Sequence, residues 1–260
     1  MICNNVKYIF FDIDDTFTTH GKITQEAYSS LWNLRKKEIK IIPVTGRPAG
    51  WCDHIARMWP VDAIVGENGA FFFMMKNNKL VKNYLLDDSE RKKNNLKLEQ
   101  IKNEILSTVE KVDVAKDQSY REFDLAIDFA EEISISDDKE KNKIINQITE
   151  IFKKHGANCK VSSIHINGWF GNYDKLNMTK KLALQEFLLD LDNEEDNKKC
   201  VFCGDSPNDA PMFAFFHLSI GVRNVLDFKD QLLNFPKYVT ENKFGEGFVE
   251  IADAIIADDI

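Results

Sequence analysis

The sequence predicts an α/β protein with a doubly wound parallel-sheet core and a smaller α+β domain inserted into it. Short, continuously apolar runs near both ends of the chain are typical of strands buried on both faces of a parallel sheet, and helical patterns alternate with them. Between residues 83 and 171 the pattern changes to two amphipathic helices and strands of alternating polarity. At 260 residues the chain is long enough for both domains.

The first part of the core contains three apolar strands separated by helices. We expect, in order, a strand at 8–11, a helix at 24–37, a strand at 39–44, a helix at 48–58 and a strand at 63–65. Thr24 is a good N-cap for the first helix, and Pro48 suits the first position of the second. A hairpin follows, with strands at 70–75 and 79–81 joined by an Asn-Asn turn.

The inserted segment begins where the composition changes. Residues 87–95 are almost wholly polar, which indicates an exposed connection, and we assign 1–82 and 172–260 to the core and 83–171 to the insert. Two helices are marked by apolar residues at helical spacing, namely Leu98, Ile101, Ile105 and Val109, and then Ile144, Ile148, Ile151 and Phe152. Strict alternation over 123–129 predicts a half-buried strand of an antiparallel sheet, and 161–167 a second one.

After the insert the α/β pattern resumes. We expect a helix at 178–189, an acidic loop at 193–197, strands at 199–203 and 218–222, and a terminal helix at 247–256. Because consecutive strands of such a pattern lie parallel with helices between them, these segments complete the sheet that the first part begins.

Composition excludes several functions. The formal net charge of -8 argues against a nucleic-acid surface. The N-terminus has no signal-like pattern and no run approaches 18 apolar residues, so we expect a cytosolic protein without a membrane partner. The five cysteines, which show no disulfide-framework spacing, are Cys3, Cys52, Cys159, Cys200 and Cys203. The last two form a C-x-x-C inside an apolar run, so we expect buried strand residues rather than a zinc or redox site.

Three acidic residues follow directly on the first buried strand. Asp12-Ile13-Asp14-Asp15-Thr16 places them at the carboxyl end of that strand, the edge where open α/β sheets bind ligands. An acidic surface turn is the simple alternative, because a D-x-D-x-T match alone is weak. However, carboxylates clustered beside a buried strand repel one another unless a cation is bound, and Mg²⁺ is the natural occupant.

A second strand end carries groups suited to a phosphate. Thr45-Gly46-Arg47-Pro48 offers a hydroxyl, a glycine backbone that a ligand can approach closely and the N-terminus of a helix. The same stretch could be merely a strand-to-helix turn.

A third strand ends in Gly204-Asp205-Ser206-Pro207-Asn208-Asp209. Asp205 projects from the strand end, where it could complete a cation site with Asp12 and Asp14. Asn208 and Asp209 could hold that cation's waters or orient a lysine. A capped turn with acids in the first turn explains the other residues but not Asp205.

Lys175 lies just before the helix predicted at 178–189. A lysine beside a phosphate binds it and offsets the charge of a carboxylate nucleophile. A surface lysine is the ordinary alternative, and Lys180 and Lys181 compete for the role. We prefer Lys175 because it precedes the helix.

These four pieces, in this order, resemble the four motifs of the haloacid dehalogenase-like hydrolases, and the similarity spans almost the whole chain. The insert resembles the C2-type cap of the Cof-like and sugar-phosphatase branch, class IIB, and Asn68-Gly69-Ala70 resembles a stretch of the same branch. The resemblance implies a Rossmann-like core and a magnesium-dependent phosphatase acting on a small phosphorylated metabolite. Asp15 departs from the glycine that is commoner at that place.

The resemblance also implies roles for single residues. Asp12 would be the nucleophile that forms a phosphoaspartate, and Asp14 the general acid and base. The residues implied for phosphoryl binding are Thr45, Gly46 and Lys175. The implied ligands of Mg²⁺ are Asp12, Asp14 through its backbone carbonyl, and Asp205, supported by Asn208 and Asp209.

Substrate choice is expected to lie with the cap, which closes over the core site. Its polar or aromatic candidates for substrate contact are Arg121, His165, Asn167 and Trp169, with a structural or surface role as the simpler alternative for each. Class IIB relatives often act on sugar phosphates, so we expect a sugar phosphate by analogy. A phosphomutase of the same family and a non-catalytic phosphorylatable or cation-binding module stay open as alternatives, and the oligomeric state is not predicted.

Overall fold

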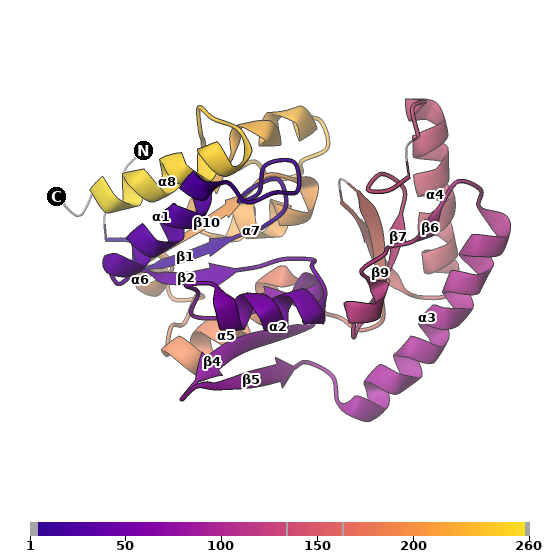
Figure 1. Ribbon diagram of the computed structural model, residues 1–260, viewed down its shortest axis with the longest axis horizontal. Helices are drawn as coiled ribbons and strands as arrows, with labels where there is room; N and C mark the ends of the chain where they lie inside the picture. The colour runs from indigo at the N-terminus through magenta and orange to yellow at the C-terminus, as the bar shows by residue number, and fades with distance from the viewer. Residues whose placement is uncertain (1–4, 134, 163, 258–260) are drawn as a thin grey trace.

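Five parallel strands form the centre of the core. The computed structural model describes residues 5–133, 135–162 and 164–257. The sheet has the order β12-β11-β10-β1-β2, and every neighbouring pair runs parallel. Its strands are β1 (Tyr8–Phe11), β2 (Lys40–Pro43), β10 (Cys200–Gly204), β11 (Leu218–Gly221) and β12 (Tyr238–Val239). The predicted parallel-sheet core is therefore confirmed (Figure 1).

Helices cover both faces of this sheet because its strands are apolar on both sides. Helices α1 (Gln25–Lys36) and α8 (Phe244–Ala257) pack against one face. Helices α5 (Lys175–Phe187) and α7 (Ala210–Phe215) pack against the other. The two phenylalanines that end β1 point to opposite faces, as neighbouring strand residues must, and each is fully buried. The sheet is thus doubly wound, as predicted.

An antiparallel hairpin extends the core beyond β2. Its strands are β3 (Ile64–Gly66), β4 (Phe71–Lys76) and β5 (Lys79–Tyr84). A parallel bridge between Val44 and Val65 joins this unit to the end of β2, and helix α2 (Ala49–Met58) packs against it. Asn77 and Asn78 have positive φ angles of 50° and 61°, as a two-residue hairpin turn of this type requires. The predicted hairpin is confirmed, with a second strand that runs on to Tyr84.

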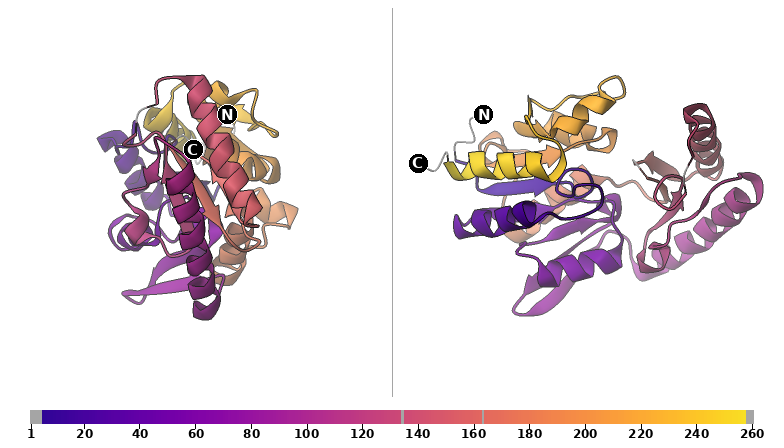
Figure 2. Two further views of the ribbon diagram at one scale, coloured as in Figure 1. Left: turned by 90° about the vertical axis from the view of Figure 1, so that its right-hand side faces the viewer. Right: turned by 45° about the horizontal axis from the view of Figure 1, so that its top comes forward.

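The inserted segment forms a separate α+β lobe that stands beside the carboxyl ends of the core strands (Figures 1 and 2). Its elements are α3 (Asp88–Thr108), β6 (Asp113–Val114), β7 (Asp124–Asp128), α4 (Asp138–Lys154), β8 (Asn158–Val161) and β9 (His165–Trp169). The antiparallel sheet has the order β6-β7-β9-β8, and α3 and α4 cover one of its faces. This is the expected inserted cap; the boundaries at 82/83 and 171/172 stay a prediction.

The polar stretch at 87–95 is not a connection but the first part of α3. Asp87 caps this helix by accepting a hydrogen bond from the Glu90 backbone at 2.9 Å. The prediction was wrong because this part of α3 carries few apolar residues, so no apolar stripe marks it.

In the described part of the chain, every helix is too short or too polar to span a bilayer.

The strand predicted at 161–167 is two strands and the turn between them. β8 ends at Val161 and β9 begins at His165. In the turn the Ser162 backbone N–H donates to the His165 carbonyl at 2.8 Å. No glycine or proline marks this reversal, which is why the sequence pattern reads straight through it.

Several shorter elements connect the core strands. The acidic segment predicted as a loop contains helix α6 (Glu194–Asn197), whose N-cap Asn193 accepts from two backbone N–H groups. Helix α8 begins three residues earlier than predicted. Short 3₁₀ helices occur at η1 (Glu67–Gly69), η2 (Gln118–Tyr120), η3 (Pro207–Asp209) and η4 (Arg223–Phe228).

Strand β7 is buried on both faces, contrary to the half-buried strand predicted. Asp124 and Asp128, on the face opposite the cap helices, are only 3% and 2% exposed. Asp124 accepts hydrogen bonds from Arg121 and Asn167, at 2.9 Å each. Alternating polarity identified the two faces correctly, but it does not reveal that the polar face meets other polar groups instead of water.

The cysteines behave as apolar core residues. Cys200 and Cys203 lie fully buried on β10. Burial first, and then the Asp196 carboxylate, raise the pKa of Cys200 to about 12, so its thiol stays protonated at neutral pH. Cys3 lies outside the described residues.

Candidate active site

The ends of β1 and β10 lie side by side at the carboxyl edge of the sheet. Phe11 pairs with Cys203, and the backbone N–H of Asp12 donates to the Cys203 carbonyl at 2.9 Å. Asp205 follows β10 directly. From here the chain crosses to β2 on one side and to β11 on the other, so Asp12 and Asp205 stand at the topological switch point where open α/β sheets bind ligands.

Lys175 connects two of the predicted carboxylates. Its Nζ lies 3.1 Å from Asp12 Oδ1 and donates to Asp209 Oδ1 at 2.9 Å, and all three residues are buried. Although burial opposes the charged form, Asp12 and Asp209 raise the pKa of Lys175, so it is a cation here. Lys175 is the first residue of α5, not a residue before the helix as predicted, because Asp174 provides the N-cap by accepting from Asn177.

Asp205 is held by groups from two other segments. The Thr16 hydroxyl donates to Asp205 Oδ1 at 3.0 Å, and the Asn224 side-chain amide donates to Oδ2 at 3.1 Å. The second oxygen of Asp209 accepts from the Asp205 backbone at 3.2 Å. The bonds from Thr16 and Asn224 hold the Asp205 carboxylate, and among the described residues no side-chain cation forms an ion pair with it.

The resulting charge distribution fits a divalent cation. Carboxylate oxygens of Asp12, Asp205 and Asp209 all lie within 4.8 Å of one another. Lys175 contacts two of these three carboxylates and offsets only part of their negative charge. Burial is the main cause that raises the pKa of Asp12 to about 7, and burial with the Asp209 and Asp12 charges raises that of Asp205 well above its ordinary value. Oxygen ligands with excess negative charge are what Mg²⁺ prefers. Both oxygens of Asp209 are engaged with protein groups, which suits a supporting role.

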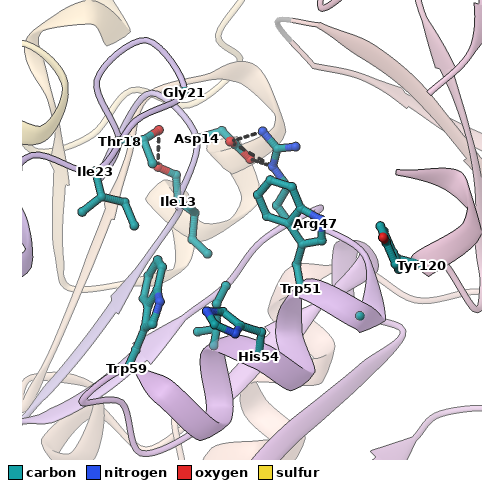
Figure 3. A pocket seen from close by; sticks show the side chains of 12 residues that line it. Ile13, Asp14, Thr18, Gly21, Ile23, Arg47, Trp51, His54, Trp59 and Tyr120 are labelled. Atoms are coloured by element: carbon teal, nitrogen blue, oxygen red, sulfur yellow. Dashed lines mark hydrogen bonds and ion pairs between the residues drawn. The ribbon is translucent and has the colours of Figure 1, made fainter. Parts of the chain in front are cut away.

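Asp14 lies at the same strand end but pairs with an arginine. Arg47 Nε and Nη2 donate to its carboxylate at 2.7 to 3.1 Å, a bidentate arrangement visible in Figure 3. The guanidinium also lies 3.7 Å from Asp117 and from Glu131 of the cap, and 4.5 Å over the ring of Trp51. Arg47 thus connects the Asp12–Asp14 loop to the cap.

Thr45 and Gly46 form a tight turn before α2. The Thr45 hydroxyl is buried and accepts from the Arg47 backbone at 3.1 Å. A Cβ on Gly46 would lie 3.2 Å from the Asn68 side chain, so any larger residue here would require the Asn68 side chain to shift slightly. Pro48 is the N-cap of α2 and not its first helical residue as predicted, so the helix begins one residue later, at Ala49.

Glu67 is a buried carboxylate that ties the cap to the core. Its side chain accepts hydrogen bonds from the Ala49 backbone at the start of α2 and from three successive backbone N–H groups, those of Glu122, Phe123 and Asp124, at 2.6 to 3.2 Å. The backbone donors lower the pKa of Glu67, but burial first, and then the Asp124 charge, outweigh them and raise the pKa to about 8. Sequence analysis missed this residue, although it stands directly before the Asn68-Gly69-Ala70 stretch.

One face of the cap sheet points toward the core. In the register of the sheet, Lys160 pairs with Asn167, which pairs with Ala126, and paired residues share a face. His165 and Trp169, two positions either side of Asn167, lie on the same face. The opposite face packs under α3 and α4.

A cavity of about 50 Å³ lies between this cap face and the core, and we call it the site cavity. The predicted residues that line it are Asp12, Asp14, Gly46, Asp205 and Asn208 from the core and Arg121, His165 and Asn167 from the cap. Burial lowers the pKa of His165, so its ring is neutral at pH 7. Arg121 donates to the Gly46 carbonyl at 3.0 Å and pairs with two cap aspartates, which gives it a structural contact as well.

Trp169 is not part of the site cavity. It is 3% exposed and stacks on Tyr173 with the ring centroids 5.7 Å apart, in the apolar cluster where the cap meets the core.

Lys160, which sequence analysis did not single out, reaches from the cap to donate to the Asn208 carbonyl at 3.4 Å. Burial and the nearby Lys175 lower the pKa of Lys160.

The chain matches the model of one protein family over residues 9–251, that of the haloacid dehalogenase-like hydrolases. A comparison with curated protein sequences gave no match.

Solved structures share the fold along their whole length. A Thermoplasma acidophilum protein is 17% identical with a TM-score of 0.73, covering 96% of this chain and 98% of that one. The sucrose-phosphatase from Synechocystis sp., solved with sucrose and phosphate, is 17% identical with a TM-score of 0.64 and 98% coverage of both chains. A haloacid dehalogenase-like hydrolase from Bacteroides thetaiotaomicron is 13% identical with a TM-score of 0.65, covering 96% of this chain and 99% of that one. At these identities the similarity concerns the fold.

Proposed function

Because this chain belongs to the family of haloacid dehalogenase-like hydrolases, we propose that it is a magnesium-dependent phosphatase that hydrolyses a small phosphate monoester through a phosphoaspartate on Asp12. The observation that carries the proposal is the buried group at the ends of β1 and β10, in which Lys175 contacts Asp12 and Asp209 beside Asp205. A carboxylate nucleophile, a cation to offset its charge and an acidic cation site are the parts that such a reaction needs.

In the proposed first half-reaction, Asp12 attacks phosphorus in line with the leaving oxygen. The phosphorus–oxygen bond to the alcohol breaks as the bond to Asp12 forms, and Asp14 supplies the proton that the departing oxygen takes. Lys175 holds the Asp12 carboxylate and offers charge to the phosphoryl oxygens. Asp12, Asp205 and the Asp14 backbone carbonyl would hold Mg²⁺, which offsets the negative charge of phosphate and nucleophile.

In the second half-reaction Asp14, now a carboxylate, takes a proton from water as the water oxygen attacks phosphorus. The bond to Asp12 breaks, phosphate leaves and both carboxyl groups return to their starting states. In the structure the Asp14 carboxylate accepts a bidentate contact from Arg47. For the first half-reaction Asp14 exchanges Arg47 for the leaving oxygen.

Small phosphorylated metabolites are the proposed substrates, and sugar phosphates are the first class to test. The support is an analogy: a sucrose-phosphatase is among the structures with this fold. Thr45 and Gly46 are proposed to bind the phosphoryl group, with Asn208 and Asp209 in support. The proposed compartment is the cytosol, where thiols stay reduced.

The test is phosphate release from a panel of sugar phosphates and small esters, with Mg²⁺ and with excess chelator. We expect magnesium-dependent release by the wild type and none by Asp12→Asn, which keeps the shape of the side chain but cannot attack phosphorus. Asp227→Asn, at a carboxylate 60% exposed, is the matched control and should behave as wild type. Release by Asp12→Asn at the wild-type rate would contradict the nucleophile, and phosphoryl transfer to a sugar without release would identify a phosphomutase.

A further inference from the structure

A second and larger cavity adjoins the site cavity on the core side. It has a volume of about 430 Å³ and lies between the loop that follows β1 and helix α2, with one residue of the cap at its edge. Apolar side chains make up most of its wall, and we call it the aromatic pocket after its residues Ile13, Ile23, Trp51, Ile55, Trp59 and Tyr120 (Figure 3). A volume of this order is typical of pockets that bind small molecules.

The two cavities share a wall made of side chains. Asp14 and Arg47 line both of them. These two residues form the bidentate ion pair, and the Trp51 ring lies 4.5 Å from the guanidinium, so the pair stands at the junction of the two cavities (Figure 3). Side-chain ion pairs can rearrange without unfolding any element, so a ligand that takes Asp14 away from Arg47 opens one cavity to the other.

The site cavity is much smaller than the aromatic pocket, at about 50 Å³ against about 430 Å³. The alcohol part of a phosphate ester lies next to the group that protonates its oxygen. In the proposed reaction that group is Asp14, the residue at the junction.

The lining of the aromatic pocket indicates what that alcohol part is. Apart from Asp14 and Arg47, the polar side-chain groups on its wall are His54, the Tyr120 hydroxyl, the two indole N–H groups and Thr18, whose hydroxyl already donates to the Ile13 carbonyl at 3.2 Å. A polyhydroxylated group placed here would lose more hydrogen bonds to water than these few groups replace. Trp51 is 41% exposed and Tyr120 56%, so apolar surface is left for a ligand to cover.

We propose that the aromatic pocket is the subsite for the alcohol part of the substrate, and that the enzyme prefers phosphate monoesters whose alcohol carries an aromatic or apolar group. This inference rests on the proposed phosphatase function and names a substrate class different from the sugar phosphates that the analogy with the sucrose-phosphatase suggests. The phosphoryl group lies at Asp12, the leaving oxygen at Asp14, and the apolar group against Trp51 and Ile23.

The test compares two esters with similar leaving oxygens, 2-phenylethyl phosphate and ethyl phosphate, on the purified full-length chain with Mg²⁺. Burial of a phenyl group in the pocket should raise kcat/KM for the first ester over the second by on the order of 10- to 100-fold. The ratio should fall to within about threefold in Trp51→Ala, which removes the main aromatic wall, and in Ile23→Trp, which fills the pocket. Trp32→Ala is the matched control, because Trp32 is a similarly exposed tryptophan on α1 away from the pocket, and should keep the wild-type ratio.

The outcomes separate this inference from the function on which it rests. Phosphate release from both esters with a ratio near one in the wild type overturns the subsite and leaves the phosphatase standing. If neither ester is hydrolysed, the panel of sugar phosphates and small esters decides the phosphatase proposal. Calorimetric titration of the two esters then decides the pocket: tighter binding of the phenylethyl ester that is lost in Trp51→Ala supports it, and equal binding overturns it. Circular dichroism identifies any variant that does not fold, and Ile23→Trp, at an exposed loop position, then carries the comparison.

Discussion

Replacement of Glu67 should destabilise the protein far more than the loss of one ordinary carboxylate. The Glu67 side chain is fully buried and accepts from four backbone N–H groups, one at the start of α2 and three in the segment that enters β7. In Glu67→Ala these donors lose their acceptor inside the protein. An unsatisfied buried donor costs about 1–3 kcal/mol, so the lower end for four donors gives a loss of about 4 kcal/mol in the free energy of unfolding.

Urea unfolding followed by tryptophan fluorescence measures this loss. With a slope of about 3 kcal/mol/M, the midpoint should fall by about 1 M. Glu67→Gln separates hydrogen bonding from packing, because glutamine fills the same space but keeps an acceptor oxygen at one position only and turns an N–H₂ group toward the donors at the other. We expect about half of the loss to persist. Glu99→Ala, at a side chain 60% exposed, is the control and should stay within about 0.5 kcal/mol of wild type. A Glu67→Ala midpoint indistinguishable from that of Glu99→Ala would refute the reasoning.

Two further predictions concern the reaction site. Asp14→Asn should lower kcat by about 10²- to 10⁴-fold. The leaving group of p-nitrophenyl phosphate departs without a proton, so with this ester the variant should still release a burst near one equivalent of nitrophenol before the slowed hydrolysis of the phosphoaspartate limits turnover. Steady turnover near the wild-type rate would contradict the proposed role of Asp14. Mg²⁺ at about 100 times its dissociation constant should add about 2.7 kcal/mol of stability, or roughly 5–10 °C in the thermal midpoint. Asp205→Asn should lose most of that shift and Asp227→Asn keep it, so equal shifts in the two variants would argue against the cation site.

The convergence of Asp12 and Asp205 could be predicted from the sequence because it depends on one general property of parallel sheets. Two short apolar runs each end in an acidic residue, and carboxyl ends of parallel strands meet at one edge. The contact of Lys175 with Asp12 follows the same logic, since α5 begins at that edge. These residues needed only the order of strands and helices, which periodicity supplies.

The partners of Asp14 and Asp205 could not be predicted in the same way. Arg47 was visible in the sequence beside Thr45 and Gly46, but the direction of its long side chain depends on the cap carboxylates and Trp51 that surround it. Asn224, which donates to Asp205, lies in a 3₁₀ helix that no pattern marks. Glu67 was missed because its partners are backbone groups of a segment more than fifty residues away, and backbone donors leave no trace in a sequence.

The cap shows where alternation stops being informative. Period-two spacing places His165, Asn167 and Trp169 on one face of a strand, and the structure agrees. Which part of that face meets the site is set by the path of the chain: β9 starts over the site cavity and runs toward the return to the core, so Trp169 packs on Tyr173 instead. Lys160 reaches the core because register pairs it with Asn167, and register between two strands cannot be obtained from either strand alone. A single sequence therefore identifies the residues that share a face, whereas their positions over a site depend on contacts between segments.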